Sequence, residues 1–373
     1  MKKKVLFLIE SFIAGGAERA LLTLANSMDK TRFDVTVVSV FKKSVYEGYD
    51  AKFEDDFLPD VHRKYLIDNT VRWKYILFNY MYNKLPKRWF HRILIGKGYD
   101  TEVAFYEGLP TTFLAHSSNG KSKKIAWLHY GDGFADSVGK KREEYQSIYS
   151  GYDVVLGVSK GICENFRKRV GLNAHLKVMY NIYDEETIKR MAGTAVVERK
   201  DGFTSFVAVG RVCEVKGYDR LLRVCQKLHD EGFGLSLSIV GGGGCDGLRK
   251  VVEENLMSDY VHILGHKDNP YTYMKNSDWL VSSSFAEGFS TVIAESMIIG
   301  TPVISTLCSG TKELLGENNE WGICCENSEN GLYEAMKSVL SDRTKYSFYR
   351  ERAVVQGEKF RKKNLLEKIE SIL

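Results

Sequence analysis

Two carboxylates flank the point where a strand-like segment becomes a helix-like one. Glu287 follows the apolar run 279–281, and Glu295 lies in the apolar helix predicted over Thr291–Ile299. The first N–H groups of such a helix have no partner within it, and the helix dipole places about +0.5 charge there. The junction can therefore bind an anion. Carboxylates beside an anion site suggest a ligand with both charge and hydroxyls, such as a nucleotide sugar. Alternatively, Glu287 merely caps the helix of a buried strand-turn-helix.

A second pair of charged residues follows another predicted strand. Arg211 and Lys216 lie in a loop bounded by Gly210 and Gly217, directly after the strand predicted over residues 203–209. The carboxyl ends of parallel strands border the ligand crevice of a doubly wound sheet, so this loop should face the same crevice as Glu287. An Arg fork and a Lys point charge together suit a diphosphate. The alternative is an exposed basic loop.

The first half of the chain offers two weaker signals. Gly15 and Gly16 follow the apolar strand predicted over residues 5–9 and permit close backbone approach, but the complete G-x-G-x-x-G fingerprint is absent. His129 ends the strand predicted over residues 124–128 and precedes a turn at Gly131 and Asp132. A tight turn without a ligand, and a purely structural histidine, are the alternatives.

The elements that must position these residues form two successive runs of alternating strands and helices. This pattern predicts an α/β protein with two doubly wound parallel sheets. We place the first domain at residues 1–182 and the second at 183–356. The linker is expected in the polar, irregular segment 183–201, and a final basic helix is expected over residues 357–372.

Composition agrees with this division. The 373 residues are 44% hydrophobic and 27% charged, as in an ordinary globular protein of two domains. Seven cysteines fall within residues 163–325 without C-x-x-C spacing, which favours buried free thiols in a reducing compartment. The apolar run after the N-terminal lysines stops at Glu10. It is too short for a signal core or a membrane span, so a cytoplasmic location is expected.

The charge is distributed unevenly. Residues 1–180 hold 29 Lys and Arg against 20 Asp and Glu, whereas residues 181–373 hold 24 against 28. The stretch 71–97 has no acidic residue and mixes cations with Trp, Tyr and Phe. This composition suits an anionic membrane surface. A helix with an aromatic core face and a solvated basic face is the alternative. Nucleic-acid binding is not expected, because no recognition motif accompanies the stretch.

The sequence lacks the motifs of several other enzyme classes. H-E-x-x-H, G-x-S-x-G, Walker A and the protein-kinase motifs are absent. No Asp-x-Asp motif precedes an apolar strand, so neither a metal ion nor another cofactor is expected. Arg211, Lys216 and helix N-termini would neutralise the phosphates instead.

Together these motifs resemble those of the retaining family-4 glycosyltransferases. Glu287 and Glu295 match the family's Glu-x7-Glu motif, and residues 210–217 match its Gly-Arg-x-x-x-x-Lys-Gly loop. Residues 15–18 resemble its first glycine loop, and residues 127–129 its strand-end histidine. The resemblance implies a GT-B fold, in which two Rossmann-like domains face each other across a cleft. It also implies that the N-terminal domain binds the acceptor and the C-terminal domain the nucleotide sugar. The final helix (357–373) would cross back to the first domain.

The resemblance also assigns roles to single residues. Arg211 and Lys216 would bind the diphosphate and stabilise it as it leaves. Glu287 would contact the sugar, Glu295 the ribose, and His129 the transferred sugar. The catalytic set is therefore Glu287, Arg211, Lys216 and His129. The nucleotide-sugar contacts are expected from Gly16, Gly265, His266, Lys267, Gly288, Phe289, Ser290, Thr291 and Glu295.

The expected reaction is retaining transfer of a hexose or N-acetylhexosamine from a nucleotide sugar, with UDP-sugars favoured. The acceptor is expected to be a lipid-linked saccharide, in synthesis of a cell-surface polysaccharide at the inner face of the membrane. Glycosylation of protein Ser or Thr is a variant of this hypothesis. A nicotinamide-dependent oxidoreductase with two Rossmann units is an alternative from another enzyme class. A non-catalytic protein that binds a sugar or a nucleotide is a third hypothesis.

Overall fold

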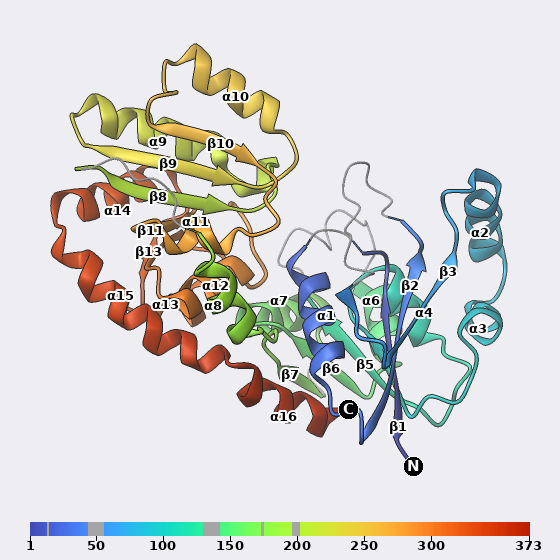
Figure 1. Ribbon diagram of the computed structural model, residues 1–373. Coiled ribbons are helices and arrows are strands. Elements are labelled where there is room, and N and C mark those ends of the chain that lie inside the picture. Colours follow the sequence, from blue (N-terminus) through green and yellow to red (C-terminus); the bar gives the residue numbers. More distant parts are fainter. Residues whose placement is uncertain (13–14, 44–55, 130–141, 173–174, 196–201) are drawn as a thin grey trace. The chain divides into compact units, whose positions relative to one another are not determined.

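The chain divides between Ile182 and Tyr183 into two compact units. Unit 1 comprises residues 1–182 and 363–373, and unit 2 comprises residues 183–362. The computed structural model describes residues 1–12, 15–43, 56–129, 142–172, 175–195 and 202–373 (Figure 1). The Gly131–Asp132 turn expected after His129 lies outside these residues. Each unit is built on one parallel sheet, as the alternation of strands and helices predicted.

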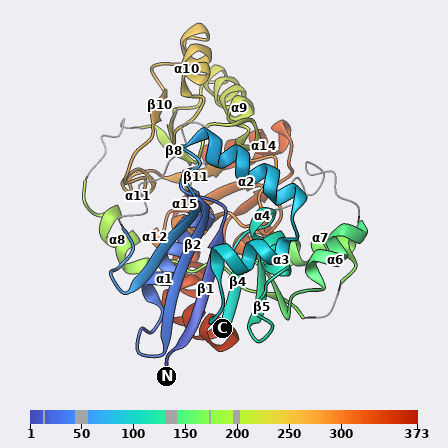
Figure 2. The same cartoon turned by 90° about the vertical axis from the view of Figure 1, so that its right-hand side faces the viewer.

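The described strands of unit 1 form a parallel sheet of order β3-β2-β1-β4-β5-β6-β7. In its centre, residues 5–9 are completely buried, which explains the continuous apolar run there. Figures 1 and 2 show α1 on one side of the sheet and α2 and α3 on the other. The strands are β1 (Lys3–Ile9), β2 (Phe33–Phe41), β3 (Val61–Ile67), β4 (Thr101–Ala104), β5 (Lys123–Leu128), β6 (Val154–Gly157) and β7 (Leu176–Val178). The helices are α1 (Gly16–Ser27), α2 (Arg72–Lys84), α3 (Lys87–Phe90), the π-helix η2 (His91–Ile95), α4 (Leu109–Ala115), α6 (Arg142–Tyr149) and α7 (Lys160–Val170).

The described strands of unit 2 form a parallel sheet of order β10-β9-β8-β11-β12-β13. Helices α9, α10 and α14 pack on it through one apolar core. Helix α12 contacts α8, α11 and α15, and α8 also contacts α11. The strands are β8 (Thr204–Val209), β9 (Leu235–Val240), β10 (Val261–Gly265), β11 (Trp279–Ser282), β12 (Val303–Thr306) and β13 (Ile323–Cys325). The helices are α8 (Glu185–Ala192), the 3-10 turn η3 (Glu214–Lys216), α9 (Tyr218–Asp230), α10 (Cys245–Glu254), α11 (Tyr271–Lys275), α12 (Thr291–Ile299), α13 (Thr311–Leu315), α14 (Glu329–Ser341) and α15 (Thr344–Gly357).

The end of the chain returns to unit 1, but its last helix begins later than expected. Helix α15 runs through Gly357, a 3-10 turn η4 (Glu358–Phe360) follows, and α16 covers Lys362–Ile372. The chain turns here because Phe360 is buried against Tyr183 and Arg361 forms a backbone bridge with Tyr183. In unit 1, the Leu373 carbonyl accepts a hydrogen bond from Thr101, and Glu370 accepts one from the Asp29 amide.

Two further expectations were wrong in detail. The segment 183–201 is not irregular throughout, because α8 begins after Asp184, whose side chain caps the helix by accepting from the Thr187 amide. The seven cysteines are all free thiols, yet only three are buried: Cys163, Cys225 and Cys245. Cys213 is exposed because it lies in the loop before η3 rather than in an apolar element.

Candidate functional site

The predicted loops of unit 2 meet where the strand order reverses. Strands β8 and β11 are neighbours in the sheet although they are distant in the chain, and the connections from them lead to opposite sides. The crevice at such a switch point is where doubly wound sheets bind ligands. The loop that holds Arg211 and Lys216 follows β8, and the loop that leads to Glu287 follows β11. The sheet therefore brings these three residues to one edge.

Lys216 and Glu287 form an ion pair at this edge of the sheet. The Lys216 Nζ atom lies 2.6 Å from Oε1 of Glu287, and the two side chains are 21% and 17% exposed. The Ser284 hydroxyl donates to the same carboxylate oxygen at 2.7 Å. Glu287 does not cap α12, because the N-cap position of that helix is Ser290. The capping alternative is therefore wrong, and the carboxylate is instead held by Lys216 and Ser284.

The two loops approach closely at Gly217. This residue has φ +62°, and a Cβ atom there would overlap the carbonyl oxygen of Ser283. The Ser283 hydroxyl donates to the Lys216 carbonyl at 2.8 Å, and the Phe285 amide donates to the Val215 carbonyl at 2.8 Å. A glycine after Lys216 is thus required by packing as well as by turn geometry.

Arg220, which sequence reasoning missed, holds the second loop in place. Its side chain is only 3% exposed and donates to the carbonyls of Ser283 and Ser284, with its Nη2 atom 2.6 and 2.9 Å from the two oxygens. The guanidinium also donates to Asn327 at 2.8 Å and lies 4.0 Å from the centre of the Phe285 ring. One signal was available: a basic residue in the first turn of α9 opposes the helix dipole, so another contact must hold it there.

Arg211 lies in a loop that is tied to the neighbouring glycine-rich turn. The Val212 amide donates to the Gly242 carbonyl at 2.7 Å, and the Gly244 amide donates to the Val212 carbonyl at 3.0 Å. Gly241 has φ +157°, and a Cβ atom there would overlap the Gly210 carbonyl. The turn 241–244 is therefore hydrogen-bonded to the Arg211 loop.

Helix α12 presents its N-terminus beside Glu287. Gly288 precedes it, Thr291 is its first residue, and the Phe289 ring is buried with its centre 5.9 Å from that of Phe360. Phe289 thus anchors the start of the helix through its side chain.

The second carboxylate of the pair is buried. Glu295 is 7% exposed and accepts a hydrogen bond from the Tyr271 hydroxyl at 3.1 Å. Burial and the Glu295 carboxylate raise the pKa of the nearby Tyr183 hydroxyl. The Tyr271 hydroxyl therefore helps to hold Glu295, a contact that the spacing of the two glutamates did not reveal.

The expected base-binding segment follows the edge strand β10. Gly265 has φ +69°, and its carbonyl accepts from the Gly241 amide at 2.9 Å. His266 and Lys267 are exposed, and the His266 ring lies 3.3 Å from Asp268. The segment is at the same carboxyl edge of the sheet as the ion pair, but its side chains are turned to solvent.

His129 lies at the carboxyl end of β5 in unit 1. Its backbone amide donates to Glu107 at 2.9 Å, and its ring stacks on Tyr106 with centres 5.9 Å apart. The Nε2 atom is buried and has no hydrogen-bond partner in the described part of the chain. Burial lowers the pKa of His129 to about 3, so the ring is neutral at physiological pH. A neutral ring with one vacant nitrogen can accept from or donate to a ligand.

The other predicted residue of unit 1, Gly16, is the first residue of α1. Gly15 precedes it as the N-cap, and a Cβ atom there would overlap the buried Glu18 carboxylate. The Glu18 carboxylate therefore occupies the space beside Gly15 in this loop.

The basic aromatic stretch divides between core and surface. Phe78 and Phe90 are buried and pack on each other, whereas Trp73, Tyr80 and Trp89 are each more than 60% exposed. Neither the core-facing alternative nor the surface alternative describes it completely. None of the described helices combines the length and apolar character needed to cross a bilayer.

Known protein families match both units of this chain. Residues 194–358 match the family described as Glycosyl transferases group 1, and residues 14–187 match Glycosyltransferase Family 4. A relative from Campylobacter jejuni is 26% identical over 97% of this chain and 96% of its own length. Its name is N-acetylgalactosamine-N,N'-diacetylbacillosaminyl-diphospho-undecaprenol 4-alpha-N-acetylgalactosaminyltransferase. An uncharacterized glycosyltransferase of Haemophilus influenzae is 23% identical over 91% of this chain and 90% of its own length.

Solved structures show the same fold. HepE of Anabaena in complex with UDP and glucose matches with a TM-score of 0.73 and 17% identity, covering 99% of both chains. Sucrose-phosphate synthase of Thermosynechococcus elongatus matches with a TM-score of 0.77 and 15% identity, covering 100% of this chain and 98% of its own. Both units of the chain are included in each match.

Proposed function

Since the chain belongs to the group 1 and family 4 glycosyltransferases and has their GT-B fold, we propose that it moves a hexose or N-acetylhexosamine from a UDP-sugar to a saccharide acceptor with retention of configuration. The observation that carries this proposal is the pairing of Lys216 with Glu287 at the switch point of unit 2. It joins a phosphate-binding cation to a hydroxyl-binding carboxylate. The nicotinamide-dependent alternative is overturned by the family membership.

The donor contacts follow from the chemistry of each group. Lys216 and Arg211 bind the diphosphate, and their charge stabilises it as it departs. Glu287, released from Lys216, accepts hydrogen bonds from the sugar hydroxyls. Glu295 accepts from the ribose hydroxyls. The backbone N–H groups at the start of α12, from Gly288 to Thr291, face the phosphate.

The remaining predicted contacts rest on the family resemblance together with local geometry. Residues 265–267 bind the base through backbone groups, in agreement with their outward-turned side chains. His129 contacts the transferred sugar through its vacant Nε2 atom. Gly16 provides close backbone approach to the donor at the start of α1.

The reaction needs no side-chain base. The acceptor oxygen attacks C1 of the sugar on the face from which the diphosphate leaves. The bond between C1 and the phosphate oxygen breaks, and that oxygen takes the acceptor proton. In this proposal, the Glu287 carboxylate stabilises positive charge at C1. A metal is not required, because the two cations and the α12 N-terminus carry the charge of the diphosphate. The described residues contain no cluster of three or more His, Cys, Asp or Glu that could hold a metal ion.

We further propose a lipid-linked acceptor at the inner face of the cell membrane, in synthesis of a surface polysaccharide. The Campylobacter relative is named for an acceptor on diphospho-undecaprenol. The exposed aromatic residues and cations of stretch 71–97 suit contact with anionic lipid headgroups. Co-sedimentation with vesicles tests this contact, with binding expected only when anionic lipid is present. Equal binding to neutral vesicles would contradict it.

Two measurements test the transferase proposal. Thermal unfolding with a panel of nucleotide sugars should show the largest stabilisation with one UDP-sugar, because a ligand of the folded state raises its stability by about 2.7 kcal/mol at a hundredfold excess over Kd. NMR of the product formed from that donor should show the donor's anomeric configuration, and transfer should continue after chelator treatment. An inverted product would refute the retaining mechanism.

A further inference from the structure

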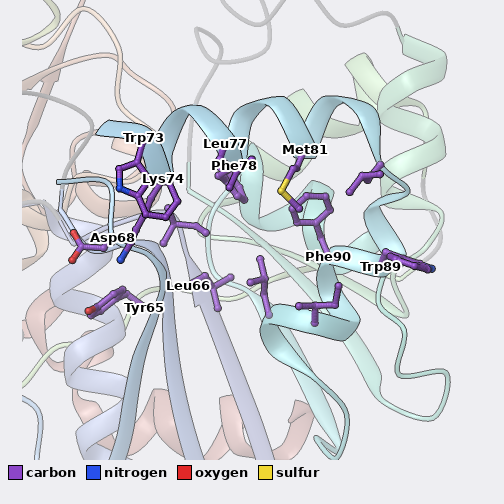
Figure 3. Close-up of a pocket in the computed structure, with 14 residues that line it drawn as sticks. Tyr65, Leu66, Asp68, Trp73, Lys74, Leu77, Phe78, Met81, Trp89 and Phe90 are labelled. Carbon is purple, nitrogen blue, oxygen red and sulfur yellow. The ribbon is translucent and has the colours of Figure 1, made fainter. Parts of the chain in front are cut away.

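An apolar groove lies on unit 1 between β3 and the helices α2, α3 and η2. Its volume is about 350 Å³, within the range of roughly 300–1,000 Å³ that is typical of small-molecule sites. Figure 3 shows α2 along one side and the side chains of β3 opposite, with Trp73 and Trp89 toward the two ends. The lining residues that matter here are Leu66, Trp73, Leu77, Met81, Trp89 and Ile93.

The groove forms because only some of the aromatic side chains of residues 71–97 are buried in the core. Phe78 is 3% exposed and stacks in a cluster with Tyr82 and Phe90, which fixes α2 and α3 on each other. The neighbouring Leu77, on the same helix, remains 45% exposed, and Ile93 of η2 is 70% exposed. A monomeric protein rarely leaves so many large apolar side chains together at its surface unless they bind something.

Most of the charged residues around the groove are basic, and the one acidic residue in its lining, Asp68, is paired with a lysine. Residues 69–99 contain no Asp or Glu, and Asp68, which lines one end, forms an ion pair with Lys42 at 3.1 Å. Lys74 lies at this same end (Figure 3) and forms no ion pair with a carboxylate of the described residues. An apolar groove with a lysine at its end suits a molecule with a hydrocarbon chain and an anionic head.

We propose that this groove binds one hydrocarbon chain of a phosphate-bearing lipid, with the phosphate at Lys74. The proposal rests on the proposed function, in which the acceptor is lipid-linked, and it goes beyond contact with a bilayer surface. The concave, largely apolar lining fits a single chain withdrawn from the bilayer, whereas a flat surface would bind headgroups alone. A second copy of this chain is a poorer occupant, because two basic rims would repel each other.

A soluble lipid phosphate tests the groove without a membrane, a donor or a saccharide. Farnesyl phosphate below its aggregation threshold should bind saturably and change the fluorescence of Trp73 and Trp89. Geranyl phosphate should bind at least about tenfold more weakly, because each buried methylene adds roughly fourfold in affinity. Inorganic phosphate should not displace the bound chain. No binding of farnesyl phosphate, or equal binding of the two lipids, would overturn the proposal.

Two matched variants locate the site. Leu77→Asp places a carboxylate in the groove and should weaken farnesyl phosphate binding at least about tenfold. Ile76→Asp introduces the same charge one residue away, at a position that is 56% exposed and outside the lining, and should change affinity less than about threefold. Equal losses in the two variants would assign the effect to charge and overturn the groove. Dimerisation of the wild-type chain that Leu77→Asp abolishes would likewise overturn it in favour of a second copy.

Failure of this proposal is distinguishable from failure of the proposed function. Circular dichroism and urea unfolding, measured for both variants, check that unit 1, which carries the substitutions, is folded. If the groove binds the chain, Leu77→Asp should raise the KM for a lipid-linked acceptor and leave transfer to a lipid-free saccharide unchanged. Unchanged KM for both acceptors would reject the groove while the transferase activity stands. Absence of transfer to any acceptor would reject the transferase proposal, and farnesyl phosphate binding would still be measurable.

Discussion

The Lys216 ammonium and the Glu287 carboxylate lie 2.6 Å apart, although the two residues are 71 positions apart in the chain. Each is the partner of the other in the structure, yet the proposed reaction assigns one to phosphate and the other to sugar. Donor binding must then exchange the Lys216 contact from carboxylate to diphosphate. That exchange leaves Glu287 with the Ser284 hydroxyl and with space for a sugar hydroxyl.

Removing either partner should therefore have separable effects. Lys216→Ala should weaken UDP binding by about tenfold to a hundredfold, since a hydrogen bond to a charged group contributes roughly 1.5–3 kcal/mol. Glu287→Gln should retain UDP binding within about threefold but lower kcat by about a hundredfold or more. Calorimetric titration with UDP and a transfer assay measure the two effects. Lys250→Ala, an exposed change on α10, is the control, and equal loss of UDP affinity in both Lys216→Ala and Glu287→Gln would contradict the assignment.

Arg220 should be essential for the geometry of the second loop. Arg220→Lys keeps the charge but loses the fork that reaches Ser283 and Ser284, leaving buried carbonyls unsatisfied. We expect a loss of about 2 kcal/mol or more in the free energy of unfolding. Arg223→Lys on the same helix, with a side chain 58% exposed, should cost less than about 0.5 kcal/mol. Urea unfolding compares them, and similar losses in both would show that Arg220 does not brace the loop.

Glu295 should set the preference for ribose. The variant Glu295→Gln keeps the size of the side chain and removes the charge that accepts from hydroxyls. The wild-type protein should prefer UDP to its 2′-deoxy counterpart by about tenfold, and the variant should bind both with similar affinity. Competition binding measures this ratio. Glu253→Gln, at an exposed position of α10, should keep the wild-type ratio; an unchanged ratio in Glu295→Gln would remove the ribose contact from the proposal.

Because its ring is buried, His129 should lower the free energy of unfolding at acidic pH. Burial lowers its pKa in the folded state to about 3, below the unfolded value of about 6.5. Above pH 6.5 both states are neutral at this ring. As the pH falls below that value, the unfolded chain binds a proton that the folded state does not, so unfolding becomes easier. The loss attributable to His129 should reach about 2 kcal/mol at pH 5.

Urea unfolding at pH 7 and pH 5 checks this expectation. His129→Gln removes the titrating ring and should lose about 2 kcal/mol less than the wild-type protein between the two pH values. His62→Gln, with a side chain 68% exposed, should show the wild-type dependence. NMR of the folded protein should find the His129 ring neutral at pH 5; a protonated ring at that pH would refute the prediction.

Local chemistry in the sequence was sufficient for the two-sheet architecture and for several candidate site residues. Apolar strand runs such as residues 5–9, and glycines such as Gly217 beside a cation, record constraints that act within one strand or one turn. A β-α-β alternation also predicts which ends of the strands carry ligand-binding loops. For this reason the loops of Arg211 and Glu287 could be assigned to one edge of a sheet before the structure was known.

Contacts between distant segments could not be obtained in this way. The amphipathic pattern of α9 does not show that Arg220 reaches the carbonyls of Ser283 and Ser284, because that distance depends on the order of strands in the sheet. Strand β3 (Val61–Ile67) is rich in polar residues, so its pattern does not indicate that it forms one wall of the apolar groove. The sequence by itself thus determined the elements and the chemical types at their ends. Only the tertiary structure decided that Lys216 pairs with Glu287 and that side chains of residues 71–97 line a groove with β3. Packing brings these residues together although they are far apart in the chain.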